Sequence, residues 1–327
     1  MEGWRTVNDP PSVTLIVVNW NSGELLAKCL GTVAQLTVQP DVLVIDNNSS
    51  DGSAEFADGL KNVTLVRMEE NLGFAAANNY AIEKADTEFV ALLNPDAFPE
   101  PNWLKSLLDA ARNHPEFDAF GSRQLKSECP EYLDGVGDIY HISGLMWRDR
   151  HGVRLSSGDL ESREIFSPCA AGALYRRHVI QEIGGFDEDF FCYVEDVDLG
   201  FRLRLSGRRA LYVPDAIVHH VGSATSGGHK SHFTIYHGHR NMVWVFMKNM
   251  PSPLFWLLLP LHLGVNLMAI AWYSCSGHRR IILKAKWDAI KGVTGAWRKR
   301  RGIQQRRIAP ISDLWRVLDK RLSPKRG

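Results

Sequence analysis

The sequence predicts an α/β fold in which a mainly parallel sheet is flanked by helices and followed by a helical extension that associates with a membrane. Three observations support this prediction. Short apolar strand signals alternate with segments of helical apolar spacing before residue 100. The stretch from Asn249 to Gly277 contains no Asp, Glu, Lys or Arg. The chain after it, residues 278–327, is strongly basic.

Strand and helix signals come in pairs along the first part of the chain. The pairs are 13–18 with 24–36, 42–46 with 54–60, and 63–67 with 74–84, followed by a strand at 88–93. This alternation predicts parallel strands joined by right-handed crossovers. Ligands of such sheets bind beyond the carboxyl ends of the strands.

Amides and carboxylates follow the predicted strands at those ends. They are Asn19, the run from Asp46 to Asp51, Asn71 and the tripeptide Asn94-Pro95-Asp96. A nucleotide fits such a rim. Because the P-loop and the glycine motif of dinucleotide-binding folds are absent, its phosphates would need a divalent cation, for which Asp96 is the candidate ligand. An ordinary turn is the alternative interpretation of Asn-Pro-Asp.

The second half of the body is less regular. A helix begins near Trp103, and the stretch 117–167 predicts loops and short strands that shape a substrate cleft. Regular structure returns after Cys169. The predicted elements are a strand at 173–175, a helix at 176–183 that stops at Gly184-Gly185, a helix beginning near 194–196, and a strand at 216–220.

Two further groups are candidates for chemistry. Six carboxylates and several aromatic residues crowd residues 186–198. Glu195 and Asp196 fall at a predicted helix start, where a carboxylate can act as a general base or merely cap the helix. His220 ends the last predicted strand, and a neutral imidazole there would complete a metal site with Asp96, although a structural histidine is the alternative.

The net charge of +1 hides an uneven distribution. Residues 278–327 hold 16 Lys/Arg and three Asp/Glu, which leaves 22 and 34 for the rest of the chain. Such a basic tail seeks an anionic surface. The apolar segment directly before it favours a membrane over a nucleic acid, so no nucleic-acid partner is expected.

The segment Leu254–Tyr273 is about long enough to cross a bilayer, but it carries Pro260, His262 and Asn266. A single crossing would also separate the body from the basic tail, against the positive-inside rule. We therefore expect a re-entrant or interfacial hairpin on an anionic membrane surface, with Trp287 and Trp297 as interfacial anchors. The alternative is a helical hairpin packed on the body or on a second subunit, so a homo-oligomer stays open.

The N-terminus lacks the apolar core of a signal peptide, so the protein is not expected to be secreted. The five cysteines form no CxxC pair and suit a reducing compartment. Together these features predict the cytoplasmic face of the inner membrane.

The ordered motifs resemble one enzyme family. They are N-W-N, I-D-N-N-S-S-D-G-S, N-L-G-F-A-A-A-N-N, L-L-N-P-D-A, G-G-F-D-E-D-F-F, V-E-D-V-D-L-G-F-R and H-H-V-G-S. This set resembles the inverting glycosyltransferases of family 2 with the GT-A fold, especially the bacterial rhamnosyltransferase-like branch, over residues 12–225. The implied organisation is an N-terminal extension (1–11), a catalytic domain (12–248) with donor (12–100) and acceptor (101–248) halves, an apolar segment (249–277) and a basic tail (278–327).

The resemblance also implies roles for individual residues. Asp196, with Glu195 beside it, would be the base that deprotonates the acceptor hydroxyl, and Asp96 with His220 would hold Mg²⁺ or Mn²⁺. One departure is that the family's D-x-D element reads Asn94-Pro95-Asp96, which leaves one carboxylate for the metal. With the polar rim included, the expected donor-binding residues are Asn19, Asp46, Asn47, Asn71, Gly73, Asn78, Asn94 and Asp96.

The expected reaction is transfer of a sugar from a dTDP- or UDP-sugar to a lipid-linked glycan or polysaccharide precursor in cell-envelope synthesis. Rhamnose rests on the resemblance alone. The alternatives are a catalytically weak sugar-nucleotide-binding scaffold at the membrane and a nucleotidyltransferase. A two-carboxylate glycosidase does not explain the rim of asparagines.

Overall fold

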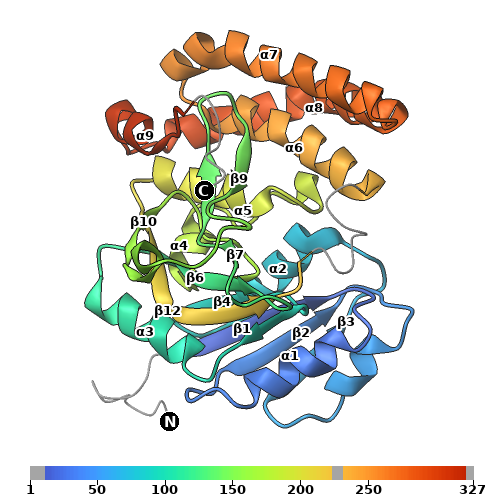
Figure 1. Ribbon diagram of the computed structural model, residues 1–327, viewed down its shortest axis with the longest axis vertical. Helices are drawn as coiled ribbons and strands as arrows, with labels where there is room; N and C mark the ends of the chain where they lie inside the picture. The colour runs from blue at the N-terminus through green and yellow to red at the C-terminus, as the bar shows by residue number, and fades with distance from the viewer. Residues whose placement is uncertain (1–11, 223–230, 322–327) are drawn as a thin grey trace.

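The computed structural model describes residues 12–222 and 231–321 (Figure 1); the expected N-terminal extension 1–11 lies outside them. Its centre is one large sheet. The strands in spatial order are β10 (Arg163–Ile165), β12 (Ala210–His220), β6 (Ala119–Lys126), β11 (Gly172–Arg176), β4 (Phe89–Leu93), β1 (Val13–Asn19), β2 (Asp41–Asp46) and β3 (Val63–Arg67). The short strands β5 (Ala97–Pro99) and β7 (Leu133–Gly135) pair with β12 and β6.

The expected α/β fold with a mainly parallel sheet is confirmed. β1 pairs in parallel with β2 and β4, β2 with β3, and β6 with β12. Four strands differ: β11 runs antiparallel between β4 and β6, and the short strands β10, β5 and β7 also pair antiparallel with their neighbours. The first four strands all end at the same edge of the sheet, so their polar carboxyl ends come together as the sequence predicted.

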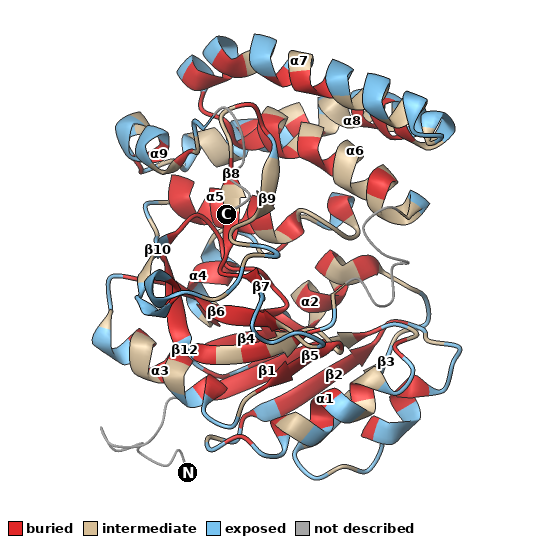
Figure 2. Cartoon of the chain, in the orientation of Figure 1, coloured by how far each residue is buried: buried red, intermediate tan, exposed pale blue. Residues whose placement is uncertain are grey.

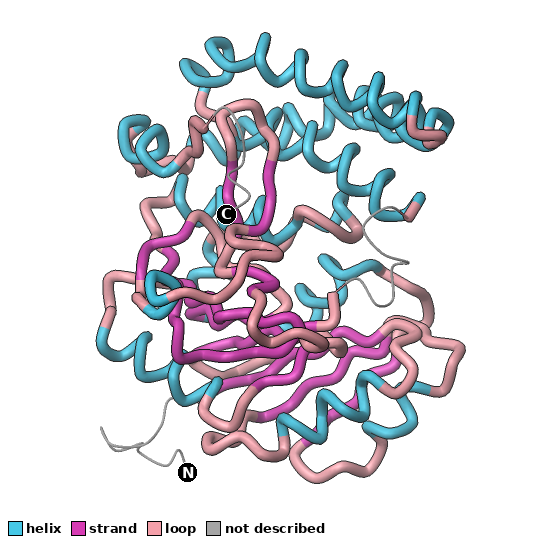
Figure 3. Tube along the Cα trace, in the orientation of Figure 1, coloured by secondary structure: helices cyan, strands magenta, loops and turns pink. Residues whose placement is uncertain are grey.

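Helices cover both faces of the sheet (Figure 3). Leu15 and Val17 of β1 pack on the side of α1 (Leu25–Val33) and α3 (Trp103–Asn113), whereas Ile16 packs on the side of α2 (Gly73–Lys84), α4 (Arg177–Glu182) and α5 (Glu195–Leu205). This alternation is why the strand is apolar from Leu15 to Val18 and buried on both faces (Figure 2). Each fully buried large aliphatic side chain contributes about 1.5–3 kcal/mol.

Two elements differ from the sequence-based expectation. The helix predicted at 54–60 is only a 3₁₀ turn, η1 (Ser53–Ala57), because Gly52 and Gly59 on either side take left-handed conformations. The stretch 117–167 contains the long central strand β6, which lacks β-branched residues. Its buried Ser122 is hydrogen-bonded by Trp103 and by the carbonyl of Gly172, so tertiary partners stabilise a strand that local sequence does not indicate.

A helical layer covers the end of the body that carries α5. It consists of α6 (His232–Asn249), α7 (Ser252–Cys275), α8 (Arg279–Gln305) and α9 (Ile311–Val317) (Figure 1). The apolar segment is one continuous helix, α7, and the hairpin expected within 249–277 is not formed. The turn comes after it at Gly277, whose φ of 84° reverses the chain into α8.

The polar residues of α7 face the protein. The Nδ1 of His262 donates to the carbonyl of Ser143 at 2.8 Å, and Oδ1 of Asn266 accepts from Lys286 of α8. The side chains of His262 and Asn266 are both buried. The polar groups that disfavoured a lipid-exposed helix are therefore satisfied inside the protein.

Candidate active site

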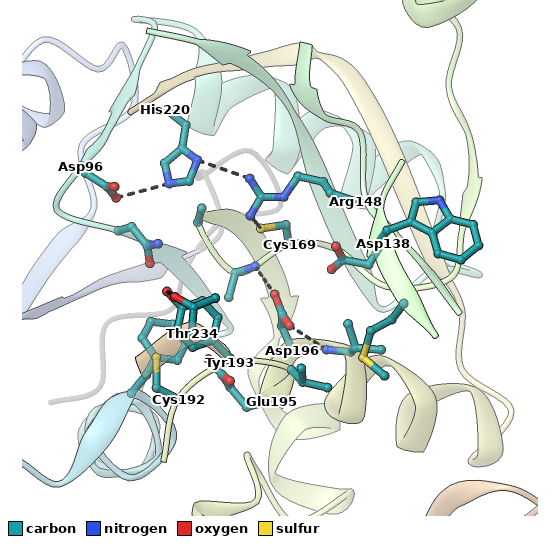
Figure 4. A pocket seen from close by; sticks show the side chains of 18 of the residues that line it. Asp96, Asp138, Arg148, Cys169, Cys192, Tyr193, Glu195, Asp196, His220 and Thr234 are labelled. Carbon is teal, nitrogen blue, oxygen red and sulfur yellow. Dashed lines mark hydrogen bonds and ion pairs between the residues drawn. The ribbon is translucent and has the colours of Figure 1, made fainter. Parts of the chain in front are cut away.

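A cavity of about 850 Å³ opens at the carboxyl ends of β1 and β4, between the sheet and the helical layer. Figure 4 shows carboxylates, an arginine and a histidine around it. Eight residues predicted from the sequence line its wall: Asn47, Asn71, Gly73, Asn94, Asp96, Glu195, Asp196 and His220. The structure therefore brings residues from five separate segments of the chain into one site.

Asn47 and Asn71 build the turn that leads into α2. Asn47 donates to Asn71 Oδ1 at 2.9 Å and to the carbonyl of Gly73 at 3.1 Å, and it accepts from the amide of Leu72. Gly73 has a φ of 81°, and a Cβ there would lie 2.5 Å from the carbonyl oxygen of Phe191. Only glycine fits this close approach of two backbones.

Asn19, Asp46 and Asn78 do not line the cavity among the described residues. Asn19 is buried and donates to Asp46, Ser49 and Ser53, so it fixes the loop after β2. Asn78 lies inside α2 and donates to the carbonyl of Phe74. In this structure the three residues lie behind the wall of the cavity.

Asp96 and His220 lie together on adjacent strand ends. The Nε2 of His220 is 3.3 Å from Oδ1 of Asp96. The Nδ1 of His220 is 2.7 Å from Oδ2 of Asp134, whose carboxylate also pairs with Arg148. The neighbouring His219 points to the other side of β12 and contacts Glu100, as strand alternation requires.

This arrangement fits a divalent cation. A carboxylate on Nδ1 fixes the histidine tautomer that presents the Nε2 lone pair, which is the usual support of a metal-binding histidine. Among residues 12–222 and 231–321 no group of three or more His, Cys, Asp or Glu is placed to hold a metal by itself. Two protein ligands plus substrate phosphates are the usual set for Mg²⁺, so the pair suits a cation that binds with its substrate.

The surroundings of His220 favour its protonated form. Burial disfavours the imidazolium, but hydrogen bonds with Asp134 and Asp96 outweigh it and raise the pKa of His220. Burial would also raise the pKa of Asp134, but hydrogen bonds from His151 and His220 and the charge of Arg148 hold it well below its usual range. Asp134 therefore stays ionised and keeps His220 oriented.

Glu195 and Asp196 begin α5 on another side of the cavity (Figure 4). Asp196 is partly exposed; its Oδ2 accepts from the amide of Ala170 at 3.3 Å, and its Oδ1 accepts from the amide of Val197. Burial raises the pKa of Asp196, although these hydrogen bonds oppose the shift. Glu195 is buried, and burial followed by the charge of Asp196 raises its pKa well above the usual range. The two adjacent carboxyl groups therefore disfavour each other's ionisation.

Sequence analysis missed three residues of this site, which come from the stretch 133–148. Asp134 supports His220, Arg148 bridges Asp134 and Cys169, and Asp138 faces Asp196. Burial and the charge of Asp196 raise the pKa of Asp138 well above its usual range. The only sequence signal was that each aspartate adjoins a glycine, in Asp134-Gly135 and Gly137-Asp138.

Cys169 has a structural role. It is buried and accepts a hydrogen bond from Arg148 at 3.1 Å, and burial raises the pKa of its thiol to about 12. A thiol that stays protonated at neutral pH is a poor nucleophile.

Known proteins resemble this chain along most of its length. A family model described as "Glycosyltransferase like family 2" matches residues 10–241. The N-acetylglucosaminyl-diphospho-decaprenol L-rhamnosyltransferase of Mycobacterium tuberculosis is 29% identical over 75% of this chain and 88% of its own. The O-antigen chain rhamnosyltransferase RfbN of Salmonella typhimurium is 27% identical over 65% of this chain and 67% of its own.

Solved structures share the fold. The mannosyltransferase PcManGT of Pyrobaculum calidifontis, in complex with GDP-Man and Mn²⁺, covers 96% of this chain and 91% of its own, with a TM-score of 0.53 and 18% identity. Residues 1–349 of S. aureus TarS, in complex with UDP-GlcNAc, cover 90% of both chains, with a TM-score of 0.59 and 16% identity. At such identities the likeness shows the fold alone.

Proposed function

Since the chain belongs to the glycosyltransferase-like family 2, we propose that it transfers a sugar, rhamnose by its relatives, from a nucleotide-sugar donor to a hydroxyl of a lipid-linked glycan, with inversion. The observation that carries the proposal is one cavity with Asp96 and His220 on one side and Asp196 on another. The names of the rhamnosyltransferase relatives support the sugar and the lipid diphosphate acceptor.

The donor binds at the strand ends in this proposal. Asn47 and Asn71 hold the turn before α2 and line the cavity at the strand ends. Asp96 and His220 hold a Mg²⁺ or Mn²⁺ ion, which would neutralise charge on the donor diphosphate and improve the leaving group. Asn94 beside Asp96 contributes an amide where the family pattern has an acid.

Asp196 acts on the acceptor. Its carboxylate takes the proton of the acceptor hydroxyl as the oxygen attacks the anomeric carbon of the donor sugar. The bond from that carbon to the diphosphate breaks on the opposite face, so the configuration inverts. The buried surroundings that raise the pKa of Asp196 bring it nearer to neutrality, which suits a general base.

A donor panel tests this function. Purified protein is incubated with dTDP-rhamnose, UDP-sugars and GDP-sugars and a polyprenyl-diphosphate-linked acceptor, with Mn²⁺ or with EDTA. We expect release of a nucleoside diphosphate and a glycosylated lipid, at a rate that EDTA lowers on the order of 100-fold. Release of pyrophosphate would indicate nucleotidyl transfer, and donor binding without turnover would indicate a scaffold.

We also propose that the helical layer binds the cytoplasmic face of the inner membrane peripherally. One face of α7 packs on the protein through Leu254, Leu258 and Val265. The opposite face exposes large apolar side chains, and α8 continues it with Trp287 and Ile290. The exposed large apolar residues of α7 are Trp256, Leu257, Leu261, Leu263, Leu267, Met268 and Trp272.

Basic residues border this apolar face. Arg279, Arg280, Lys284 and Lys291 of α8 are exposed. An apolar face rimmed by cations fits an anionic bilayer surface, with α7 lying in the interfacial plane. This orientation keeps the basic tail and the catalytic body on one side of the membrane, which satisfies the positive-inside rule.

Vesicle flotation tests the membrane surface. Replacing Trp256 and Trp272 together by serine should weaken binding to phosphatidylglycerol vesicles about 100-fold, because each buried tryptophan contributes about 1.5–3 kcal/mol. Leu160→Ser, an exposed apolar residue of the body, is the matched control and should not change binding. Equal binding of both variants would place the membrane contact elsewhere.

A further inference from the structure

The segment between η3 (Glu188–Phe190) and α5 has an unusual backbone. Phe191, Tyr193 and Val194 have φ of 64°, 68° and 74°, although none of them is glycine. Phe191 forms the rare γ-turn of positive φ, closed by a 2.7 Å hydrogen bond from the amide of Cys192 to the carbonyl of Phe190. Each such residue costs about 1–3 kcal/mol and persists only where its surroundings impose it.

This strained segment joins the two halves of the site. On one side, the carbonyl of Phe191 accepts from the amides of Phe74 at 2.6 Å and Ala75 at 3.2 Å, in the first turn of α2. On the other side, Val194 directly precedes Glu195 and Asp196 at the start of α5. The conformation of residues 191–194 therefore sets the position of the proposed base relative to the donor helix.

Two residues of α6 impose that conformation. The buried Asn241 directs its Nδ2 at three carbonyls, those of Phe190 at 3.0 Å, Cys192 at 3.0 Å and Tyr193 at 2.8 Å. Arg240 donates to the carbonyls of Asp189 at 3.0 Å and Phe190 at 2.9 Å, and its Nε donates to Oδ1 of Asn241. Both polar atoms of the Asn241 amide are thus engaged, and only an amide provides this donor and acceptor pair.

Arg240 and Asn241 lie on a part of α6 that is fixed to α8. Tyr236 donates to Asp288, the carbonyl of His239 accepts from Lys286, and Trp244 donates to the carbonyl of Ala289. The guanidinium of Arg240 also lies over the ring of Trp244 at 4.5 Å. The strained segment is therefore held from the helical layer, the part of the chain that carries the apolar surface.

We propose that Arg240 and Asn241 are positioning residues for sugar transfer: they hold residues 191–194 in the strained conformation that aims Asp196 at the acceptor hydroxyl. Neither residue lines the cavity among the described residues, so they act through the segment and not on a substrate. The proposal rests on the proposed function through the role of Asp196. Whether Arg240 and Asn241 fix residues 191–194 can be measured without any enzymatic reaction.

Asn241→Ala and Asn241→Asp test the proposal, and Asn249→Ala is the control. Asn249 is also buried on α6, but its side chain contacts Asp198 and not residues 191–194. For Asn241→Ala we expect kcat to fall about 10- to 100-fold, since a displacement of about 1 Å can cost that much, with the donor KM within about threefold. Asn241→Asp should fall at least as far, because a carboxylate would face three carbonyl oxygens.

Two readouts separate positioning from simple destabilisation. Hydrogen exchange at the amides of Phe74 and Ala75 should accelerate in Asn241→Ala but not in Asn249→Ala, whatever the reaction catalysed. The acid limb of the kcat profile should move to lower pH in Asn241→Ala, as Asp196 becomes more solvated. Arg240→Lys, which keeps the charge but loses the planar fork, should show the same changes to a smaller extent.

The outcomes are distinct. If Asn241→Ala loses thermal stability like Asn249→Ala but keeps its kcat, its pH profile and its amide protection, the positioning role is wrong. If the wild-type protein turns over no donor while the exchange result holds, the proposed function fails and the hold on the segment stands.

Discussion

Asp196→Asn should lower kcat by about 10²- to 10⁴-fold, which is the usual contribution of a positioned general base, while donor KM stays within about threefold. The substitution keeps the shape of the side chain, and its single amide oxygen can still accept from one of the two backbone amides, of Ala170 and Val197, that donate to the two carboxylate oxygens. What it removes is the ability to take a proton. Steady-state kinetics with the donor and acceptor identified by the panel would measure the effect.

The wild-type pH profile provides a second measure of the same group. Because the pKa of Asp196 is raised, the deprotonated form that acts as base is present above that raised pKa and disappears as pH falls through it. We therefore expect kcat to decline on the acid side at a pH above that of an ordinary aspartate. The acid limb should be absent from the residual activity of Asp196→Asn.

Glu188→Gln is the matched control for this variant. Glu188 belongs to the same acidic stretch, but it lies outside the cavity and accepts from Asn79 near the surface. Its kcat should stay within about twofold of wild type, as expected of a surface substitution. An Asp196→Asn protein that is folded and turns over at the wild-type rate would remove the base assignment.

Local sequence predicted the part of the fold in which buried parallel strands alternate with helices. β1 to β4 are apolar runs separated by helical periods, and their order alone brings Asn71 and Asp96 to one edge of the sheet. The same reasoning did not predict the strand β6 or the antiparallel direction of β11. β6 is stabilised by buried polar partners such as Ser122 and Trp103, and the antiparallel direction of β11 depends on a connection that periodicity does not encode.

The residues of the site likewise fall into those that local sequence predicts and those that it does not. Asp96, Asp196 and His220 lie at element ends, where their residue type and place in the chain point to chemistry. Asp134 and Asn241 act over long separations, since Asp134 meets His220 across 86 residues and Asn241 meets Phe190 across 51. Nothing local in the sequence marks such partners, because their roles arise only when distant segments pack together.

The apolar segment 249–277 shows how far composition alone can predict structure. The sequence indicated membrane contact from the apolar run, and His262 and Asn266 argued against a simple span. In the folded chain both residues lie on the protein side of α7. The continuous helix needs no internal turn, because the basic helix α8 already packs beside it and completes the hairpin.

Asp96→Asn should weaken Mn²⁺ binding in the presence of nucleoside diphosphate at least about tenfold and lower kcat on the order of 100-fold, since a metal contributes several kcal/mol to stabilising transition-state charge. Asp96 is the only carboxylate of the Asn94-Pro95-Asp96 element. The amide retains the contact distance to His220 but loses the negative charge that a hard cation prefers. Calorimetric titration of Mn²⁺ would report the binding change independently of turnover.

Two further variants test whether Mn²⁺ affinity depends on carboxylates at this element. Asn94→Asp adds the missing acid on the wall of the same cavity and should tighten Mn²⁺ binding, because the number of charged ligands sets affinity for such cations. Glu100→Gln removes the carboxylate beside His219, on the other side of β12, and should leave Mn²⁺ binding unchanged. If Asp96→Asn and Glu100→Gln bind Mn²⁺ equally well, the cation does not use Asp96, and the transfer must rely on arginine or backbone groups to neutralise the donor diphosphate.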